Sequence, residues 1–164
     1  MASKKMVEAL NSQINAELYS SYLYLSMAAY FEDLNLDGFA TWTKFQAKEE
    51  VEHAMKFYGY VGDVGSRVIL DAIDKPPAEF ASPLAVFEEI LAHEQKVTKA
   101  VHDLKKLAID EADYATDGFL QWFVAEQVEE EATAAKVVEK LKLVGDSPQG
   151  LLMLDRQLAM RGQH

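Results

Sequence analysis

The chain lacks cysteine and has little proline or glycine. With no cysteine among its 164 residues, disulfides, thiolate metal sites, iron–sulfur clusters and cysteine nucleophiles are excluded. Only four prolines and eight glycines occur, and residues 6–62 contain no proline. No apolar run approaches the roughly 18 residues that a membrane-spanning helix needs, and the N-terminal residues turn amphipathic without a signal-peptide core. We therefore expect a cytoplasmic protein that does not contact a membrane.

Positive charge is also scarce. Lys and Arg number 16 against 27 Asp and Glu, which gives a formal net charge of −11 at pH 7. So acidic a chain disfavours nucleic acid and anionic membranes as partners and favours cations. The length is that of one domain, and an apolar fraction of 49% supplies a core, so we predict a single domain over residues 1–164.

Apolar side chains recur at three- and four-residue spacings along most of the chain. Strand-like alternation is nearly absent, so the pattern predicts an all-α fold. Ser82 and Ser147 each precede a proline, which is typical of an N-cap followed by proline at the first helical position. The predicted helices cover about residues 4–33, 37–65, 82–110, 113–144 and 148–161.

The connections indicate how the four long helices are arranged. The first and second helices are joined by a short link, as are the third and fourth, so each pair lies antiparallel. The link over residues 66–81 is 16 residues long and contains Pro76 and Pro77. Sixteen extended residues reach roughly 50 Å, whereas a helix of about 25 residues is about 38 Å long. We therefore predict a four-helix bundle with one long crossover between the second and third helices, followed by a short fifth helix.

Each long helix carries polar residues in the middle of its apolar stripe. The interrupting residues are Glu17, Glu50 with His53, Glu94, and Gln127 with Glu130. The second and fourth helices place a polar pair at positions i and i+3, which share a face. An offset of 77 residues carries Glu17 onto Glu94 and the second helix's pair onto the fourth helix's pair. A bundle with two-fold-like symmetry would bring all of these groups to one level.

A single glutamate on a helix usually faces solvent, but these glutamates share one depth on four apolar stripes. Burying ionised carboxylates without cations costs several kcal/mol each, and a metal cluster removes that cost. Carboxylates with one imidazole suit iron or manganese better than structural zinc. Glu50 and His53 form a Glu-x-x-His pair, which together with a glutamate from two other helices is half of a di-iron pattern. The fourth helix has Gln127 and Glu130 where that pattern has a second such pair.

Three segments are highly specific in combination. They are residues 15–24 (NAELYSSYLY), 49–54 (EEVEHA) and 125–131 (AEQVEEE). On these segments the sequence resembles the non-haem ferritins of the prokaryotic type, and the resemblance covers the whole chain. It implies the ferritin-like bundle and an iron-storage ferroxidase, which oxidises Fe(II) with O2 or peroxide at a di-iron carboxylate centre within each subunit.

The resemblance also implies roles for individual residues. Glu17, Glu50 and His53 match the ligands of the first ferroxidase iron. Glu50 would bridge to a second iron, whose other ligands would be Glu94 and Glu130. These five residues would both bind the metal and carry the catalysis.

Further residues match the surroundings of such a centre. Tyr24 matches a tyrosine beside it, and Gln127 matches a glutamine that orients the oxygen species, so both would take part in catalysis. A third iron site is matched by four glutamates, Glu49, Glu126, Glu129 and Glu130. No haem is expected, because Val51 stands where the haem-binding bacterioferritins have a methionine.

Ferritins assemble as hollow shells, so the resemblance implies a homo-oligomer of 24 subunits that takes up iron and O2 or peroxide and stores Fe(III) as a mineral. Two other functions stay open on the residues alone. A di-iron oxidoreductase that acts on an organic substrate would need a pocket beside the metals. A non-catalytic helical binding or structural protein would bind no metal, and its glutamates would face solvent.

Overall fold

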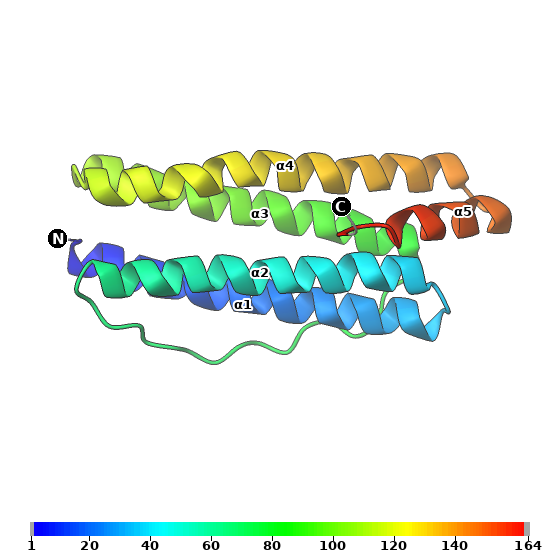
Figure 1. Ribbon diagram of the computed structural model, residues 1–164, viewed down its shortest axis with the longest axis horizontal. Coiled ribbons are helices and arrows are strands. Elements are labelled where there is room, and N and C mark those ends of the chain that lie inside the picture. The colour runs from blue at the N-terminus through cyan, green and yellow to red at the C-terminus, as the bar shows by residue number, and fades with distance from the viewer. Residues whose placement is uncertain (1, 163–164) are drawn as a thin grey trace.

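The computed structural model describes residues 2–162, which form five helices and no strand. The four long helices are α1 (Lys4–Asp33), α2 (Asp37–Asp63), α3 (Pro83–Asp110) and α4 (Tyr114–Val144), and α5 (Pro148–Leu158) is short (Figure 1). The expected fold class, an all-α four-helix bundle with a fifth C-terminal helix, is confirmed. The domain expected over residues 1–164 includes residues 1 and 163–164, which lie outside the described residues.

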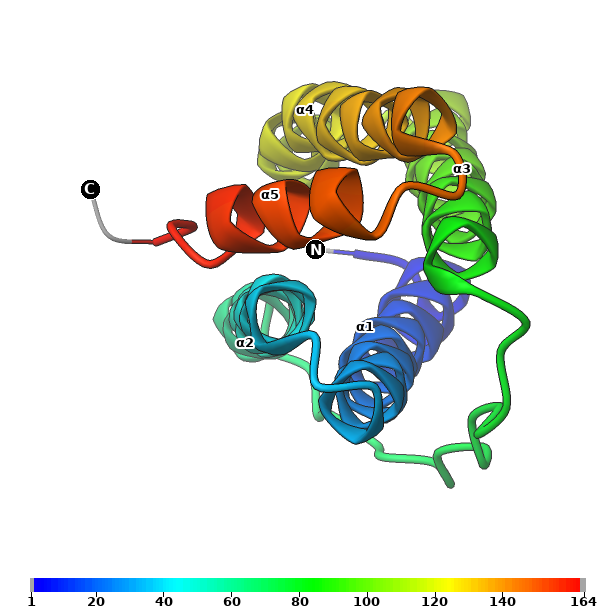
Figure 2. The same ribbon diagram turned by 90° about the vertical axis from the view of Figure 1, so that its right-hand side faces the viewer.

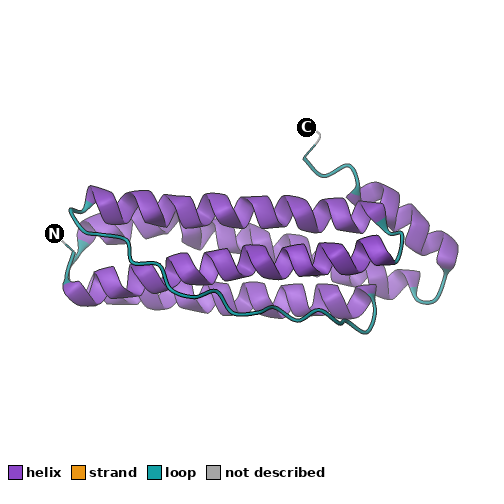
Figure 3. Cartoon of the chain, turned by 90° about the horizontal axis from the view of Figure 1, so that it is seen from below, coloured by secondary structure: helices purple, strands orange, loops and turns teal. Residues whose placement is uncertain are grey.

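The link between α2 and α3 runs along the outside of the bundle from one end to the other (Figure 3). This is the long crossover that its length predicts. Asn15 fixes part of the link, because its side-chain amide donates to the backbone oxygens of Asp71 and Ala72, the latter at 3.0 Å. Within the described residues, no helix is both long and apolar enough to cross a bilayer.

The helix boundaries lie within three residues of those expected. α3 and α4 each begin one residue late because Ser82 and Asp113 are caps, whose side chains accept a hydrogen bond from the backbone amide three residues on. α2 ends at Asp63 rather than at 65, since Gly65 turns the chain with a φ of 76°. α5 ends at Leu158 rather than at 161, because the amides of Met160 and Arg161 bond only three residues back.

The apolar core is divided into two clusters by a polar layer. The cluster near the α1–α2 turn contains Phe31, Phe39 and Phe87, and the ring centroids of the first two lie 5.0 Å apart. The cluster at the other end contains Phe57 stacked on Phe123, with ring centroids 4.2 Å apart. Both clusters draw on all four long helices. The residues between them on each helix are therefore shielded from water at both ends.

The fifth helix closes one end of the bundle. α1 packs along α2 and α3 along α4, whereas α2 and α4 have no Cα atoms within 8 Å of each other. α5 contacts both α2 and α4 and crosses the end between them (Figure 2). The first turn of α2 has no cap from its own N-cap residue. Asp155 of α5 serves instead, since its Oδ1 accepts from the backbone amide of Phe39 at 3.0 Å.

Candidate metal centre

The polar layer is buried on all four long helices. The residues expected there lie between 1% and 7% exposed: Glu17, Glu50, His53, Glu94, Gln127 and Glu130. A non-catalytic helical protein was expected to have glutamates that face solvent, so the burial of these glutamates argues against that interpretation. Because buried ionised carboxylates need a compensating partner, the layer requires protons, hydrogen-bond donors or cations.

The ligand atoms of the layer form two adjoining groups. Glu17, Glu50 and His53 each offer an atom within 4.8 Å of the others, and so do Glu50, Glu94 and Glu130. Glu50 belongs to both groups, so one carboxylate lies between two positions that can each hold a cation. This is the arrangement that the sequence resemblance implies for a bridging ligand.

The first group contains a buried oxygen without a partner. His53 Nδ1 lies 3.2 Å from Glu50 Oε2 and 3.8 Å from Glu17 Oε2. Glu17 Oε2 accepts no hydrogen bond, although Gln13 Nε2 donates to the other oxygen, Oε1, at 3.0 Å. A buried acceptor left unpaired is costly. A cation between Glu17 and His53 would satisfy it.

Two hydrogen-bond donors hold the carboxylate of Glu94. The hydroxyl of Tyr24 donates to Oε1, and Gln127 Nε2 donates to Oε2 at 3.1 Å. Gln127 also lies 3.1 Å from Thr98 Oγ1. Tyr24 and Gln127, the two residues expected beside the centre, therefore act on the same ligand from opposite halves of the bundle.

Gln46 is a residue of the centre that was not predicted from the sequence. Its Nε2 donates to Glu50 Oε1 and to Glu130 Oε2, each at 2.8 Å. A signal was present, because Gln13 precedes Glu17 by four residues just as Gln46 precedes Glu50. Residues four apart share a helix face. Each of the two glutamines therefore supports the glutamate on the next turn.

Burial and mutual repulsion keep protons on the ligands. Burial raises the pKa of Glu50 and of Glu94 to about 7 each, and that of Glu130 to about 9. Burial alone would lower the pKa of His53, but its interactions with the nearby carboxylates of Glu17 and Glu50 outweigh that effect and raise the pKa to about 11. Ligands must lose their protons to bind a metal. A cation that enters this centre therefore displaces protons.

The four glutamates expected at a third site are only partly brought together. Glu126 and Glu130 offer atoms within 4.8 Å of His53. Glu49 and Glu129 line a small cavity of about 130 Å³ together with those two residues, but neither joins a group of close ligand atoms among the described residues. Glu49 is instead paired with a cation of the protein itself. Arg161 Nη2 lies 3.3 Å from Glu49 Oε2.

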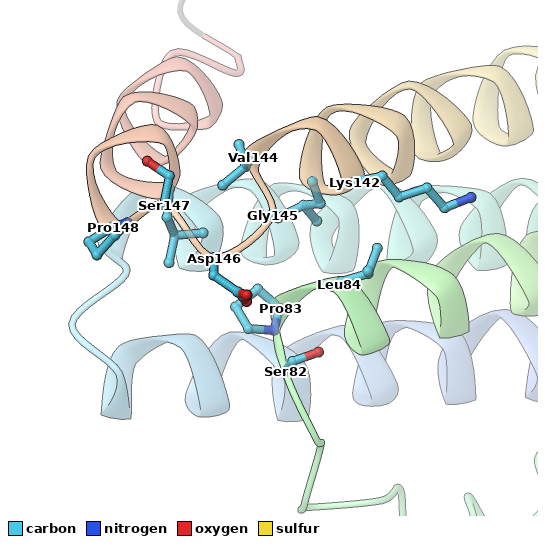
Figure 4. A pocket seen from close by; sticks show the side chains of 11 residues that line it. Ser82, Pro83, Leu84, Lys142, Val144, Gly145, Asp146, Ser147 and Pro148 are labelled. Carbon is cyan, nitrogen blue, oxygen red and sulfur yellow. The ribbon is translucent and has the colours of Figure 1, made fainter.

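A larger pocket of about 580 Å³ lies away from the polar layer (Figure 4). It is formed where α4 passes into α5, beside the first turn of α3, and its lining includes Leu84, Lys142 and Pro148. No candidate metal ligand lines it. This pocket is not the one that an enzyme acting on an organic substrate would need beside its metals.

Fold and site together define a class. A four-helix bundle whose middle layer joins two carboxylate-rich groups through one glutamate is the architecture of di-metal carboxylate proteins. The family model described as Ferritin-like domain matches residues 7–144, and the chain belongs to this family. The membership supports iron storage as the broad function, and the ferritin family binds iron.

Named relatives agree with this assignment over nearly the full chain. A protein of Bacteroides fragilis called bacterial non-heme ferritin is 46% identical over 161 residues, which cover 98% of this chain and 100% of that one. A protein of the same name from Staphylococcus epidermidis is 43% identical and covers 98% and 97%. A crystal structure of an open pore ferritin from the hyperthermophilic archaeon Archaeoglobus fulgidus matches with a TM-score of 0.97 and 55% identity, covering 98% and 99%. The resemblance to prokaryotic non-haem ferritins is confirmed.

Proposed function

We propose that this chain is a ferroxidase that oxidises Fe(II) and stores the product. One observation carries the proposal: five buried ligands from four helices converge in two adjoining groups that share Glu50. Two Fe(II) ions bound there as substrate give up one electron each. The two electrons reduce O2, which takes up two protons and becomes hydrogen peroxide, or they reduce peroxide, which takes up two protons and becomes two water molecules.

Each of the two iron ions has its own ligands, and one ligand is shared. Glu17 and His53 hold the first ion, Glu94 and Glu130 hold the second, and Glu50 touches both. Carboxylate oxygens are hard ligands, which favour Fe(III) over Fe(II) and so favour the oxidation. The hydrogen bonds that Glu94 accepts keep that ligand in place while the charge of the ion changes.

Storage requires a container as well as a centre. We propose a homo-oligomeric shell of 24 subunits in which Fe(III) collects as a mineral, each subunit being one domain over residues 1–164. The relatives named ferritin support this step. A formal net charge of −11 suits a protein whose cargo is a cation, because it raises the local concentration of iron.

Aerobic loading tests the proposal. The metal-free protein receives excess Fe(II) in air, is desalted, and its iron is counted per chain. Glu50→Gln removes a charge from the shared ligand, while Glu52→Gln removes one from an exposed position two residues away on the same helix. We expect the parent and Glu52→Gln to retain far more iron than three ions per chain, and Glu50→Gln to oxidise Fe(II) at least about tenfold more slowly.

The other outcomes are distinct. A count that stops near two or three ions per chain would preserve the di-iron centre and reject storage, which would favour oxidation of an organic substrate. The absence of stoichiometric Fe(II) binding would reject both functions. Equal oxidation rates in Glu50→Gln and the parent would reject the assignment of the centre.

A further inference from the structure

Arg161 reaches, from the C-terminal turn, the small cavity that the four glutamates expected at the third site line. It lies three residues beyond the end of α5, and its side chain is 17% exposed. Its Nη2 donates to Gln46 Oε1 at 2.6 Å and lies 3.3 Å from Glu49 Oε2. Its Nη1 donates to the backbone oxygen of Trp42 at 3.2 Å. The guanidinium is thus bonded to α2 on several sides.

Aromatic contacts and a glycine hold this arginine in position. The guanidinium carbon lies 4.1 Å from the centre of the Trp42 ring and 4.9 Å from that of Phe45. Gly162 follows with a φ of 79°, and a Cβ there would lie 2.4 Å from Phe45 Cε2. The turn therefore requires glycine both for its backbone conformation and for its contact with the ring. These contacts fix the position of the guanidinium.

The guanidinium borders an acidic cavity. The side chains that line its 130 Å³ are Glu49, Glu126, Glu129, Glu130, Thr133 and Arg161. Arg161 is the one basic residue in this lining, and it pairs with Glu49, which is half-buried. Repulsion between the carboxylates raises the free energy of the cavity, and one nearby positive charge lowers it. The guanidinium therefore compensates the negative charge of the cavity as a bound metal cation would.

We propose that Arg161 is a resident counter-ion of the third iron site, which an incoming cation must displace. The inference rests on the proposed function, because the third site belongs to it. Competition with Arg161 makes the third site the weakest of the three, so iron stays there briefly and moves on. Gln46 links the sites: its Oε1 accepts from Arg161 while its Nε2 donates to Glu50 and Glu130.

Zn²⁺ is a suitable probe because it is divalent and does not change its redox state. Calorimetric titration of the assembled, metal-free protein gives the number and affinity of the bound ions. Arg161→Gln removes the counter-ion, and Arg156→Gln removes the same charge from an exposed position on α5. Arg161→Lys keeps the charge. Gly162→Ala keeps the arginine but disturbs the turn that presents it.

We expect two tightly bound ions per chain in all five proteins. The third ion should bind at least about tenfold more tightly to both Arg161→Gln and Gly162→Ala. The first variant lacks the competing charge, and the second no longer holds that charge in the cavity. Arg156→Gln should match the parent, and Arg161→Lys should lie closer to the parent than to Arg161→Gln. This rescue by lysine separates a counter-ion from a residue that only fills space.

Three results would overturn the inference. The third affinity could be unchanged or weaker in Arg161→Gln while two ions still bind tightly, which would leave the proposed function intact. Arg156→Gln could tighten the third site equally, which would reduce the effect to overall charge. If no ion bound tightly to any of the proteins, the proposed function would fail together with the inference.

Discussion

Gln46 and Glu130 form a hydrogen bond between two helices whose backbones lie apart. Gln46 Nε2 on α2 donates to Glu130 Oε2 on α4 at 2.8 Å, although the two helices have no Cα atoms within 8 Å of each other. The same nitrogen donates to Glu50 at 2.8 Å. One neutral amide therefore holds two carboxylates at a set separation without adding a charge that would repel a cation.

Replacing that amide should weaken the centre. In Gln46→Leu, Glu50 and Glu130 each lose a donor, so we expect the second Zn²⁺ to bind about tenfold more weakly. The metal-free protein should lose about 1–3 kcal/mol of unfolding free energy, since two buried acceptors lose their shared donor. Calorimetry and denaturant unfolding measure the two effects. Gln149→Leu, at an exposed position on α5, is the control. Equal Zn²⁺ binding in Gln46→Leu and the parent would show that the amide is dispensable.

The raised pKa of Glu130 predicts how stability depends on pH. Burial and the neighbouring carboxylates raise it from 4.5 to about 9. Between these values the folded, metal-free protein holds a proton that the unfolded chain releases. The stability that protonated Glu130 contributes is therefore fully present below about pH 4.5. It is lost as the pH rises toward 9, and the free energy of unfolding falls by up to about 1.4 kcal/mol per pH unit.

Urea unfolding of the metal-free protein at pH 5, 7 and 9, at one protein concentration, checks this dependence. Glu130→Gln carries a neutral amide at every pH, so its stability should fall less steeply than that of the parent. Glu139→Gln removes an exposed charge from the same helix and should follow the parent. Parallel curves for Glu130→Gln and the parent would contradict the raised pKa.

The helices and the polar layer were predictable because their signals are local. Proline positions, caps and apolar spacing give each helix, and a polar residue at a core position can be read from the same spacing. Errors at the helix ends came from details such as the turn at Gly65. Arg161 carried no such signal, because its place depends on packing against Trp42 and Phe45, more than 110 residues earlier in the chain. Glu49 looks equivalent to the other glutamates of its site until this arginine is located.

Ion binding should release protons in a countable number. At pH 7 the metal-free centre holds protons on Glu130 and His53, and partly on Glu50 and Glu94. Filling both positions with Zn²⁺ should therefore release about three protons per chain. Calorimetry in buffers of different ionisation enthalpy measures this number. Glu130→Gln should release about one proton fewer, whereas release of fewer than one proton by the parent would refute the proposed protonation.

Close packing at Gly38 predicts how the fifth helix stays docked. A Cβ at Gly38 would lie 1.7 Å from the backbone oxygen of Asp155, so Gly38→Ala must push α5 away from α2. That movement would break the cap that Asp155 provides and withdraw Arg161 from its cavity. We expect Gly38→Ala to destabilise the protein by at least about 2 kcal/mol and to expose α5 to protease.

Gly59 offers a matched control for Gly38 on the same helix. Nothing lies within 4 Å of a Cβ built there, so Gly59→Ala adds a methyl group to a helix interior without a clash. It should stabilise the chain by about 0.5–1 kcal/mol, because alanine loses less backbone freedom than glycine on folding. Denaturant unfolding and limited proteolysis of both variants separate the two effects. If Gly38→Ala lowers the free energy of unfolding and Gly59→Ala raises it, the destabilisation by Gly38→Ala arises from its contact with α5. If both variants lower it by a similar amount, the destabilisation arises within the helix itself.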